Sequence, residues 1–109
     1  MERFAPEQAA EVTDYGALGA SVSALASLCD GAEMTWLCFE AGGALGEHEA
    51  GRDQLLVVVD GAGWLDVEGA RVELARGDVG VIRAGQRHAK GSDVGMTALV
   101  LQAPSITIA

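Results

Sequence analysis

From Glu33 onward, apolar residues recur with a period of two over short segments, which is the pattern of β-strands. The first segment spans 33–40 (EMTWLCFE), and Trp36 and Leu37 stand on its opposite faces. Both faces are largely apolar, as in a strand covered on both sides. Residues 20–28 alternate less clearly and leave strand and helix open. Further strands are predicted at 54–60, 64–68, 71–75, 79–83 and 96–103.

Glycines separate these segments. We expect Gly42-Gly43 to end the first strand and Gly61-Ala62-Gly63 to form a tight hairpin, because glycine adopts positive φ angles freely. The only expected helical feature is a short turn around 6–12. Many short strands with glycine turns predict an all-β protein, either a sandwich or an antiparallel barrel.

The chain has 109 residues, which is enough for one domain. We divide it into an N-terminal arm (1–19), a β-barrel domain (20–104) and a C-terminal tail or edge strand (105–109). A chain this short buries only a modest core, so we expect a homodimer.

The net charge is −9, from 7 basic and 16 acidic residues. Such a surface repels phosphate backbones and anionic lipids, which argues against nucleic-acid and membrane partners. The longest aliphatic run, Leu55–Val59, is too short to cross a bilayer, and the N-terminus lacks the apolar core of a signal peptide. With two cysteines that form no close pair, these features predict a cytoplasmic protein.

The chain has only two histidines, His48 and His88. In an extended segment His48, Ala50 and Gln54 share parity and face the same side. His88 lies on a separate strand, and a closed sheet can bring it opposite His48. Two converging imidazoles begin a metal site, to which the Gln54 amide adds a weak oxygen ligand. The alternative is that both histidines fill the barrel as structural residues.

The stretch 42–61 resembles the first signature motif of the cupins. Gly42 is followed by five residues and His48, and Gly61 closes the motif. Ala50 stands where the family pattern has a second histidine, and Gln54 stands at its glutamate position. The set of metal-binding side chains in this motif is therefore incomplete.

The stretch 77–92 resembles the second cupin motif. Gly77, Gly85 and His88 keep the family spacing. Arg83 replaces the proline of the pattern, and Ser92 replaces its asparagine. Together the two motifs imply a single-domain cupin, an antiparallel β-barrel or jelly roll.

This resemblance implies two functions from different classes. One is a cupin that binds a small organic molecule inside the barrel, with a degenerate metal site. The other is a metal-dependent enzyme of the dioxygenase, isomerase, lyase or cyclase type that uses His48 and His88. The implied cofactor is a divalent transition metal (Fe, Mn, Ni, Cu or Zn) on His48, Gln54 and His88, weakened because no carboxylate balances its charge. Without metal, either histidine is the candidate acid–base group.

The same interior supplies candidate pocket residues, although each is also a candidate core residue. Four basic residues flank the motifs, and we interpret them as surface charges, with attraction of an anionic substrate as the alternative. The predicted pocket residues are Trp36, Ala50, Leu56, Val58 and Met96, and the flanking basic residues are Arg52, Arg83, Arg87 and Lys90.

Overall fold

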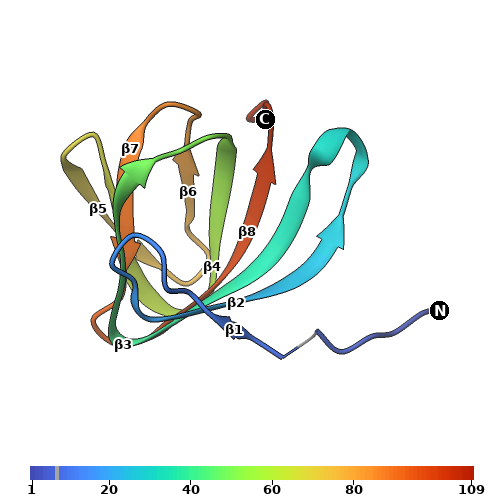
Figure 1. The fold of residues 1–109 in the computed structure, drawn as a ribbon, viewed down its shortest axis with the longest axis horizontal. Coiled ribbons are helices and arrows are strands. Elements are labelled where there is room, and N and C mark those ends of the chain that lie inside the picture. Colours follow the sequence, from blue (N-terminus) through green and yellow to red (C-terminus); the bar gives the residue numbers. More distant parts are fainter. Residues whose placement is uncertain (7) are drawn as a thin grey trace.

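The computed structural model describes residues 1–6 and 8–109, and this part of the chain is almost entirely β-structure (Figure 1). Its one helical element is a 3-10 turn at Cys29–Gly31, and no helix in the described ranges has the length and apolar character to cross a membrane. The strands are β1 (Ala10–Glu11), β2 (Leu18–Ser27), β3 (Glu33–Glu49), β4 (Asp53–Val67), β5 (Ala70–Ala75), β6 (Val79–Ile82), β7 (Arg87–Gly91) and β8 (Met96–Ala103).

Four strands close the sheet into a barrel. β3 pairs with both β7 and β8, and β4 pairs with the same two strands. All of these pairs are antiparallel. β2 extends the sheet from β3, while β5 and β6 extend it from β4. The predicted all-β antiparallel barrel is therefore confirmed.

The two longest strands bend at glycines that we expected to end them. β3 runs through Gly42-Gly43, and β4 runs through Gly61-Ala62-Gly63. Gly61 has a φ of 73°, and a Cβ atom there would collide with the carbonyl oxygen of Gly95. The predicted hairpin at 61–63 and the predicted strand end at 42–43 are therefore wrong. These glycines let a continuous strand turn the corner of the barrel and approach another backbone closely.

The N-terminal arm is extended where we expected a helical turn. Ala10 and Glu11 form β1, and Ala10 pairs with Val22 of β2. By pairing with the exposed edge of β2, the arm gives its backbone N–H and C=O groups partners within the sheet. In an isolated helical turn, most of these groups would bond to water. The helical turn is wrong for the described residues, and Glu7 lies outside them. The strand alternative for 20–28 is confirmed by β2.

The core follows the two-residue alternation. Leu37 and Phe39 of β3 are buried, whereas Trp36 on the opposite face is only half-buried. Leu56 and Val58 of β4 contribute in the same way. The buried apolar cluster consists of Ala20, Leu37, Phe39, Leu45, Ala50, Leu56, Val58, Leu65, Leu74, Ile82, Met96, Ala98 and Val100.

The C-terminal residues form a tail rather than an edge strand. The carboxylate of Asp53 accepts hydrogen bonds from the backbone N–H groups of Ala84 and Ile106, at 2.9 Å each. Arg83, at the proline position of the second motif, pairs with the same carboxylate at 3.0 Å and donates to the carbonyl of Ile106. These bonds hold the pKa of Asp53 below its usual value, with the backbone donors contributing most. Arg83 thus has a structural contact that anchors the tail.

Candidate functional site

The two histidines face each other across neighbouring strands. His48 of β3 and His88 of β7 are register partners, and their ring centroids lie 4.3 Å apart with the planes tilted by 55°. His88 is only 1% exposed, and neither of its ring nitrogens has a hydrogen-bond partner among the described residues. The sequence therefore correctly predicted that the two imidazoles converge inside the barrel.

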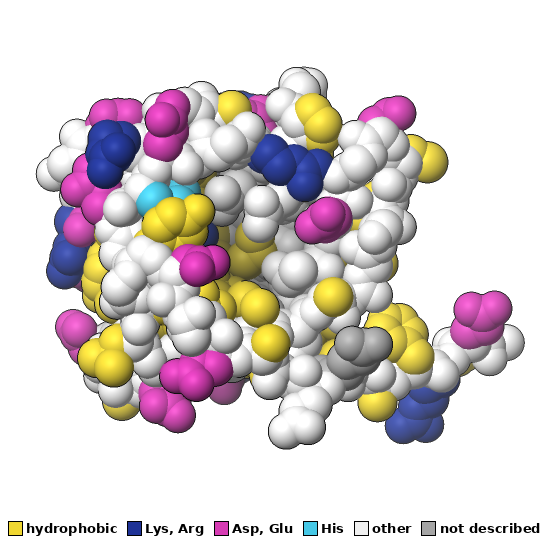
Figure 2. All heavy atoms as spheres, in the orientation of Figure 1, with side chains coloured by type: hydrophobic (Ala, Val, Ile, Leu, Met, Phe, Trp, Pro, Cys, Tyr) yellow, Lys and Arg dark blue, Asp and Glu magenta, His cyan; other side chains and the backbone are white. Residues whose placement is uncertain are grey.

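His48 is fixed by two contacts near the barrel mouth. Its Nδ1 atom lies 2.8 Å from the carbonyl oxygen of Gly46, which can only accept, so Nδ1 donates this hydrogen bond. The ring of Tyr15 stacks on the imidazole at 3.8 Å, with the planes only 7° apart. The backbone of Tyr15 is held by a hydrogen bond from the N–H of Gly46 to its carbonyl. Figure 2 shows the histidine side chains on this face, beside hydrophobic side chains and a hollow.

A lysine also lies inside the barrel. Lys90 of β7 is only 4% exposed, and its Nζ atom donates to Oε1 of Gln54 on β4 at 3.3 Å. Gln54 is itself buried. We interpreted Lys90 as a surface charge, and this interpretation is wrong. The reason is parity: Lys90 follows His88 by two residues on the same strand, so both side chains point to the same face.

Burial controls the ionisation of Lys90 and His88. Loss of solvation lowers the pKa of Lys90 to about 8, because the ammonium is removed from water. Burial also lowers the pKa of His88 to about 4, and the neighbouring Lys90 and His48 add to this effect. At neutral pH the interior therefore holds one ammonium group beside a neutral imidazole.

These side chains adjoin a cavity of about 280 Å³ at the mouth of the barrel. The imidazole that lines the cavity comes from the motif strand β3, and the amine comes from the motif strand β7. Strands β4 and β8 each supply an amide side chain. The lining residues are Tyr15, Leu45, His48, Glu49, Ala50, Gly51, Gln54, Lys90 and Gln102.

The predicted site residues divide between this cavity and the core. His48, Gln54 and Ala50 line the cavity, and His88 lies beside His48. The other predicted pocket residues do not line it. Leu56, Val58 and Met96 are packed in the buried cluster, and Trp36 lies on the opposite face of β3 from the buried Leu37 and Phe39.

Sequence reasoning missed several residues of the cavity wall, and Lys90 and Tyr15 are the two that change its chemistry most. Lys90 carried a usable signal, its parity with His88, but we grouped it with the basic residues that flank the motifs and interpreted all four as surface charges. Tyr15 carried none, because an isolated tyrosine in an irregular arm gives no hint that the arm folds back over the barrel mouth. Its stacking on His48 depends on the tertiary fold alone.

The residues at the motif positions do not suit the divalent metal that the resemblance implies. In the described part of the chain, no three His, Cys, Asp or Glu side chains are grouped so that they could hold a metal ion. The one oxygen ligand that the motif offers, Oε1 of Gln54, already accepts a hydrogen bond from the Lys90 ammonium. A divalent cation there would face a buried positive charge, and the one carboxylate that lines the cavity, Glu49, is exposed at its mouth. The free nitrogens of His88 and the 4.3 Å approach of the two imidazole rings favour a metal.

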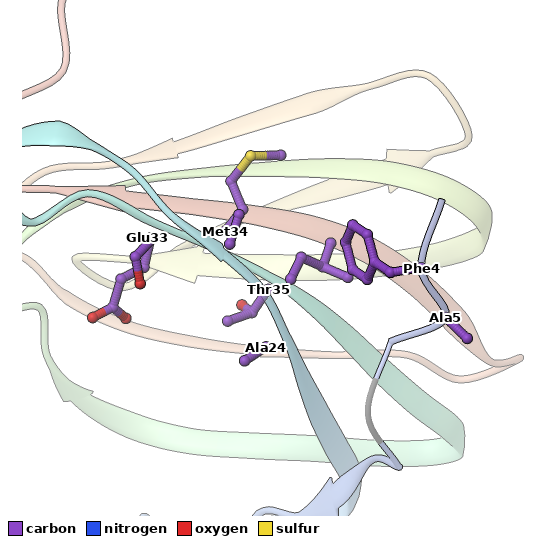
Figure 3. Close-up of a pocket in the computed structure, with 9 residues that line it drawn as sticks. Phe4, Ala5, Ala24, Glu33, Met34 and Thr35 are labelled. Atoms are coloured by element: carbon purple, nitrogen blue, oxygen red, sulfur yellow. The ribbon is translucent and has the colours of Figure 1, made fainter. Parts of the chain in front are cut away.

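A larger groove of about 600 Å³ lies away from these residues, between the N-terminal arm and the β2–β3 hairpin (Figure 3). Phe4 and Ala5 form one side, and Met34 and Thr35 of β3 form another. Its one titratable lining residue is Glu33, which is exposed. The groove therefore offers one exposed carboxylate and the hydroxyl groups of Ser27 and Thr35, whereas the buried Lys90 lies at the smaller cavity.

Comparisons with protein-family models and with curated proteins give no match for this sequence. Solved structures match it along most of its length. A structure described as KdgF from Halomonas sp. is 22% identical, with a TM-score of 0.77 over 92% of this chain and 88% of the other. A predicted oxalate decarboxylase from Thermotoga maritima is 18% identical, with a TM-score of 0.79 over 87% and 90%. A cupin-2 domain from Rhodospirillum rubrum is 15% identical, with a TM-score of 0.79 over 99% and 76%.

Proposed function

This chain has the fold of a small cupin, and on that premise we propose that it binds a small polar organic molecule at the mouth of its barrel. The observation that carries the proposal is the cavity of about 280 Å³ into which His48, Gln54 and Lys90 converge. Binding sites for drug-sized molecules measure about 300–1,000 Å³ and combine a few polar groups with apolar walls. The cavity therefore suits a ligand smaller than a typical drug.

Unsatisfied polar groups support the same proposal. The ring nitrogens of His88 are buried without a partner among the described residues, and Lys90 has one neutral partner there. Buried polar groups normally have their hydrogen bonds satisfied, since an unmade bond costs about 1–3 kcal/mol. A polar molecule bound in the cavity, or water in its absence, supplies the partners that Lys90 lacks, because Lys90 lines the cavity.

The alternative is a metal-dependent cupin enzyme that uses His48 and His88. The 4.3 Å approach of the two rings and the free nitrogens of His88 favour it. The ammonium of Lys90 beside Gln54 opposes it, because it stands against the only amide oxygen that the motif offers to a metal. We therefore place binding first and metal-dependent catalysis second.

Thermal-shift screening of a library of polar metabolites tests the binding proposal. Ala50 is 3% exposed and lines the cavity, so Ala50→Leu fills the cavity with a side chain. We expect metabolites that raise the Tm of the wild type to lose this effect in Ala50→Leu. Ala70→Leu is the matched control, because Ala70 is exposed on β5 and lies outside the cavity. Equal binding to the wild type and to a folded Ala50→Leu variant would refute the proposed location.

The homodimer stays part of this proposal. Three large apolar side chains, Phe4, Leu18 and Leu28, are 69%, 69% and 46% exposed in the single chain. A second copy that covers them would enlarge the small core of an 11.2 kDa chain. Size-exclusion chromatography with light scattering measures the mass directly. A mass of one chain at all concentrations would contradict the dimer.

A further inference from the structure

Lys90 is a buried cation without a counter-ion among the residues that the structure describes. The ion pairs in the described part of the chain involve four arginines, and none includes Lys90. Its one hydrogen-bond partner in that part is the neutral amide oxygen of Gln54. An ammonium group has three N–H donors, so two of them have no acceptor in the described ranges 1–6 and 8–109. Burying a charge in this state is costly unless something pairs with it.

The surroundings of Lys90 are rich in donors and poor in negative charge. Because Oε1 of Gln54 faces Lys90, the NH₂ group of this amide is left to donate elsewhere. Gln102 of β8 brings a second amide to the same cavity. Glu49 is the one carboxylate among the lining residues, and it is exposed at the barrel mouth. Such an environment is complementary to an anion with two or more oxygens.

We propose that the cavity binds a small organic carboxylate, with the ammonium of Lys90 as its buried counter-ion and the amide of Gln54 as a second contact. The inference rests on the proposed binding function and names its ligand class. The ammonium of Lys90 thus supplies the positive charge that a metal would supply in the site that the cupin motif implies. The site therefore binds an anion in place of a cation. The carboxylate satisfies the free donors of Lys90, and the volume of about 280 Å³ limits the ligand to a small acid.

The proposal is tested by isothermal titration of the wild type with sodium acetate, pyruvate and succinate at constant ionic strength. Acetamide, pyruvamide and succinamide serve as neutral isosteres, and sodium phosphate serves as an anion without carbon. We expect at least one carboxylate to bind at least about 30-fold more tightly than its amide, because a buried charge pair that loses one charge typically loses 2–5 kcal/mol. Equal affinity for acid and amide, or phosphate bound as tightly as the best carboxylate, would overturn the proposal.

Two variants remove the counter-ion in different ways. Lys90→Met keeps the length of the side chain without its charge, and Gln54→Glu supplies Lys90 with an internal carboxylate. Both should weaken carboxylate binding at least about 30-fold. Arg76→Met is the control, because Arg76 is exposed and loses the same unit of charge. The affinity of Arg76→Met for carboxylates should stay within about twofold of the wild-type value. Salt screens the long-range effect of the lost charge.

The outcomes separate this inference from the function on which it rests. If neutral metabolites bind and Ala50→Leu blocks them while Lys90→Met keeps full carboxylate affinity, the carboxylate inference is wrong and the binding function survives. If no molecule of either charge binds the wild type, both are wrong. Because Lys90→Met replaces a buried charge with an apolar group, we expect it to fold, and Gln54→Glu gives an independent result if it does not.

Discussion

The Nζ atom of Lys90 lies 3.3 Å from Oε1 of Gln54 in the interior of the barrel. The two residues belong to different motifs: Gln54 stands at the glutamate position of the first, and Lys90 follows the histidine of the second by two residues. A glutamate at position 54 would neutralise the ammonium, whereas the amide leaves its charge without compensation. The same substitution that removes a metal ligand therefore leaves a positive charge available to an anion.

Lys90→Met should stabilise the ligand-free protein. Burial lowers the pKa of Lys90 from 10.5 to about 8, so keeping the ammonium protonated in the folded state at pH 7 costs about 3 kcal/mol. Between pH 8 and 10.5 the unfolded chain binds more protons than the folded one, so stability rises with pH there. We expect Lys90→Met to gain about 1–4 kcal/mol at pH 7 and less at pH 10. Urea unfolding at both values checks this, and a variant less stable than the wild type at pH 7 would contradict it.

The stability of the protein should fall as the pH drops from 6.5 to 4 because of His88. Its pKa is lowered from 6.5 to about 4, chiefly by burial, with the ammonium of Lys90 and the imidazole of His48 facing it. In this window the unfolded state takes up a proton that the folded state refuses, which removes up to about 3 kcal/mol. His88→Leu should flatten the dependence of urea stability on pH between 7 and 5. An unchanged slope in this variant would assign the acid sensitivity to other groups.

Much of the fold could be predicted from the sequence because its signal is local. The alternation of Trp36 and Leu37 and the short apolar runs indicate strands, and their number and spacing predict a sandwich or an antiparallel barrel. The resemblance to the cupin motifs favours the barrel. What could not be predicted is whether a glycine ends a strand or bends it. Gly61 and Gly69 are both glycines at positive φ, yet Gly69 lies in a hairpin turn and Gly61 lies within β4. The difference comes from the approach of Gly95, a contact between residues far apart in the sequence.

The candidate site could be predicted where motif spacing fixes a side chain on a known face. His48 and His88 were placed correctly for this reason. The pocket residues were harder, because Leu56 and Ala50 are both buried in the core, yet only Ala50 also lines the cavity. Only the depth of a residue in the barrel separates these two positions, and sequence parity does not report depth.

The close approach at Gly61 gives a stability prediction with an internal control. Gly61→Ala places a Cβ against the carbonyl oxygen of Gly95 and also forces a positive φ on alanine. Gly77→Ala forces a similar φ of 92°, but its Cβ would meet open space. We expect about 1–2 kcal/mol of destabilisation for Gly77→Ala and at least about 2 kcal/mol more for Gly61→Ala. Equal effects in urea unfolding would show that backbone conformation alone explains the glycine at 61.

Metal affinity should depend on the charge at Lys90 and the missing carboxylate at Gln54. We expect the untagged wild type to carry no stoichiometric Fe, Mn, Ni, Cu or Zn by elemental analysis. The double variant Lys90→Met with Gln54→Glu removes the competing ammonium and adds a carboxylate to the two imidazoles, which is a ligand set that transition metals accept. It should therefore bind Co²⁺ with visible absorption bands that the wild type lacks.

Two controls isolate the cause of this gain. Lys90→Met alone should show weak Co²⁺ binding, because two imidazoles without a carboxylate leave the metal charge unbalanced. Adding His88→Ala to the double variant should abolish the bands, since one of the two facing imidazoles is lost. One equivalent of metal in the wild type, lost in a His48→Ala and His88→Ala double variant, would contradict the exclusion of metal by Lys90. It would also move the metal-dependent enzyme ahead of the binding protein as the function of this barrel.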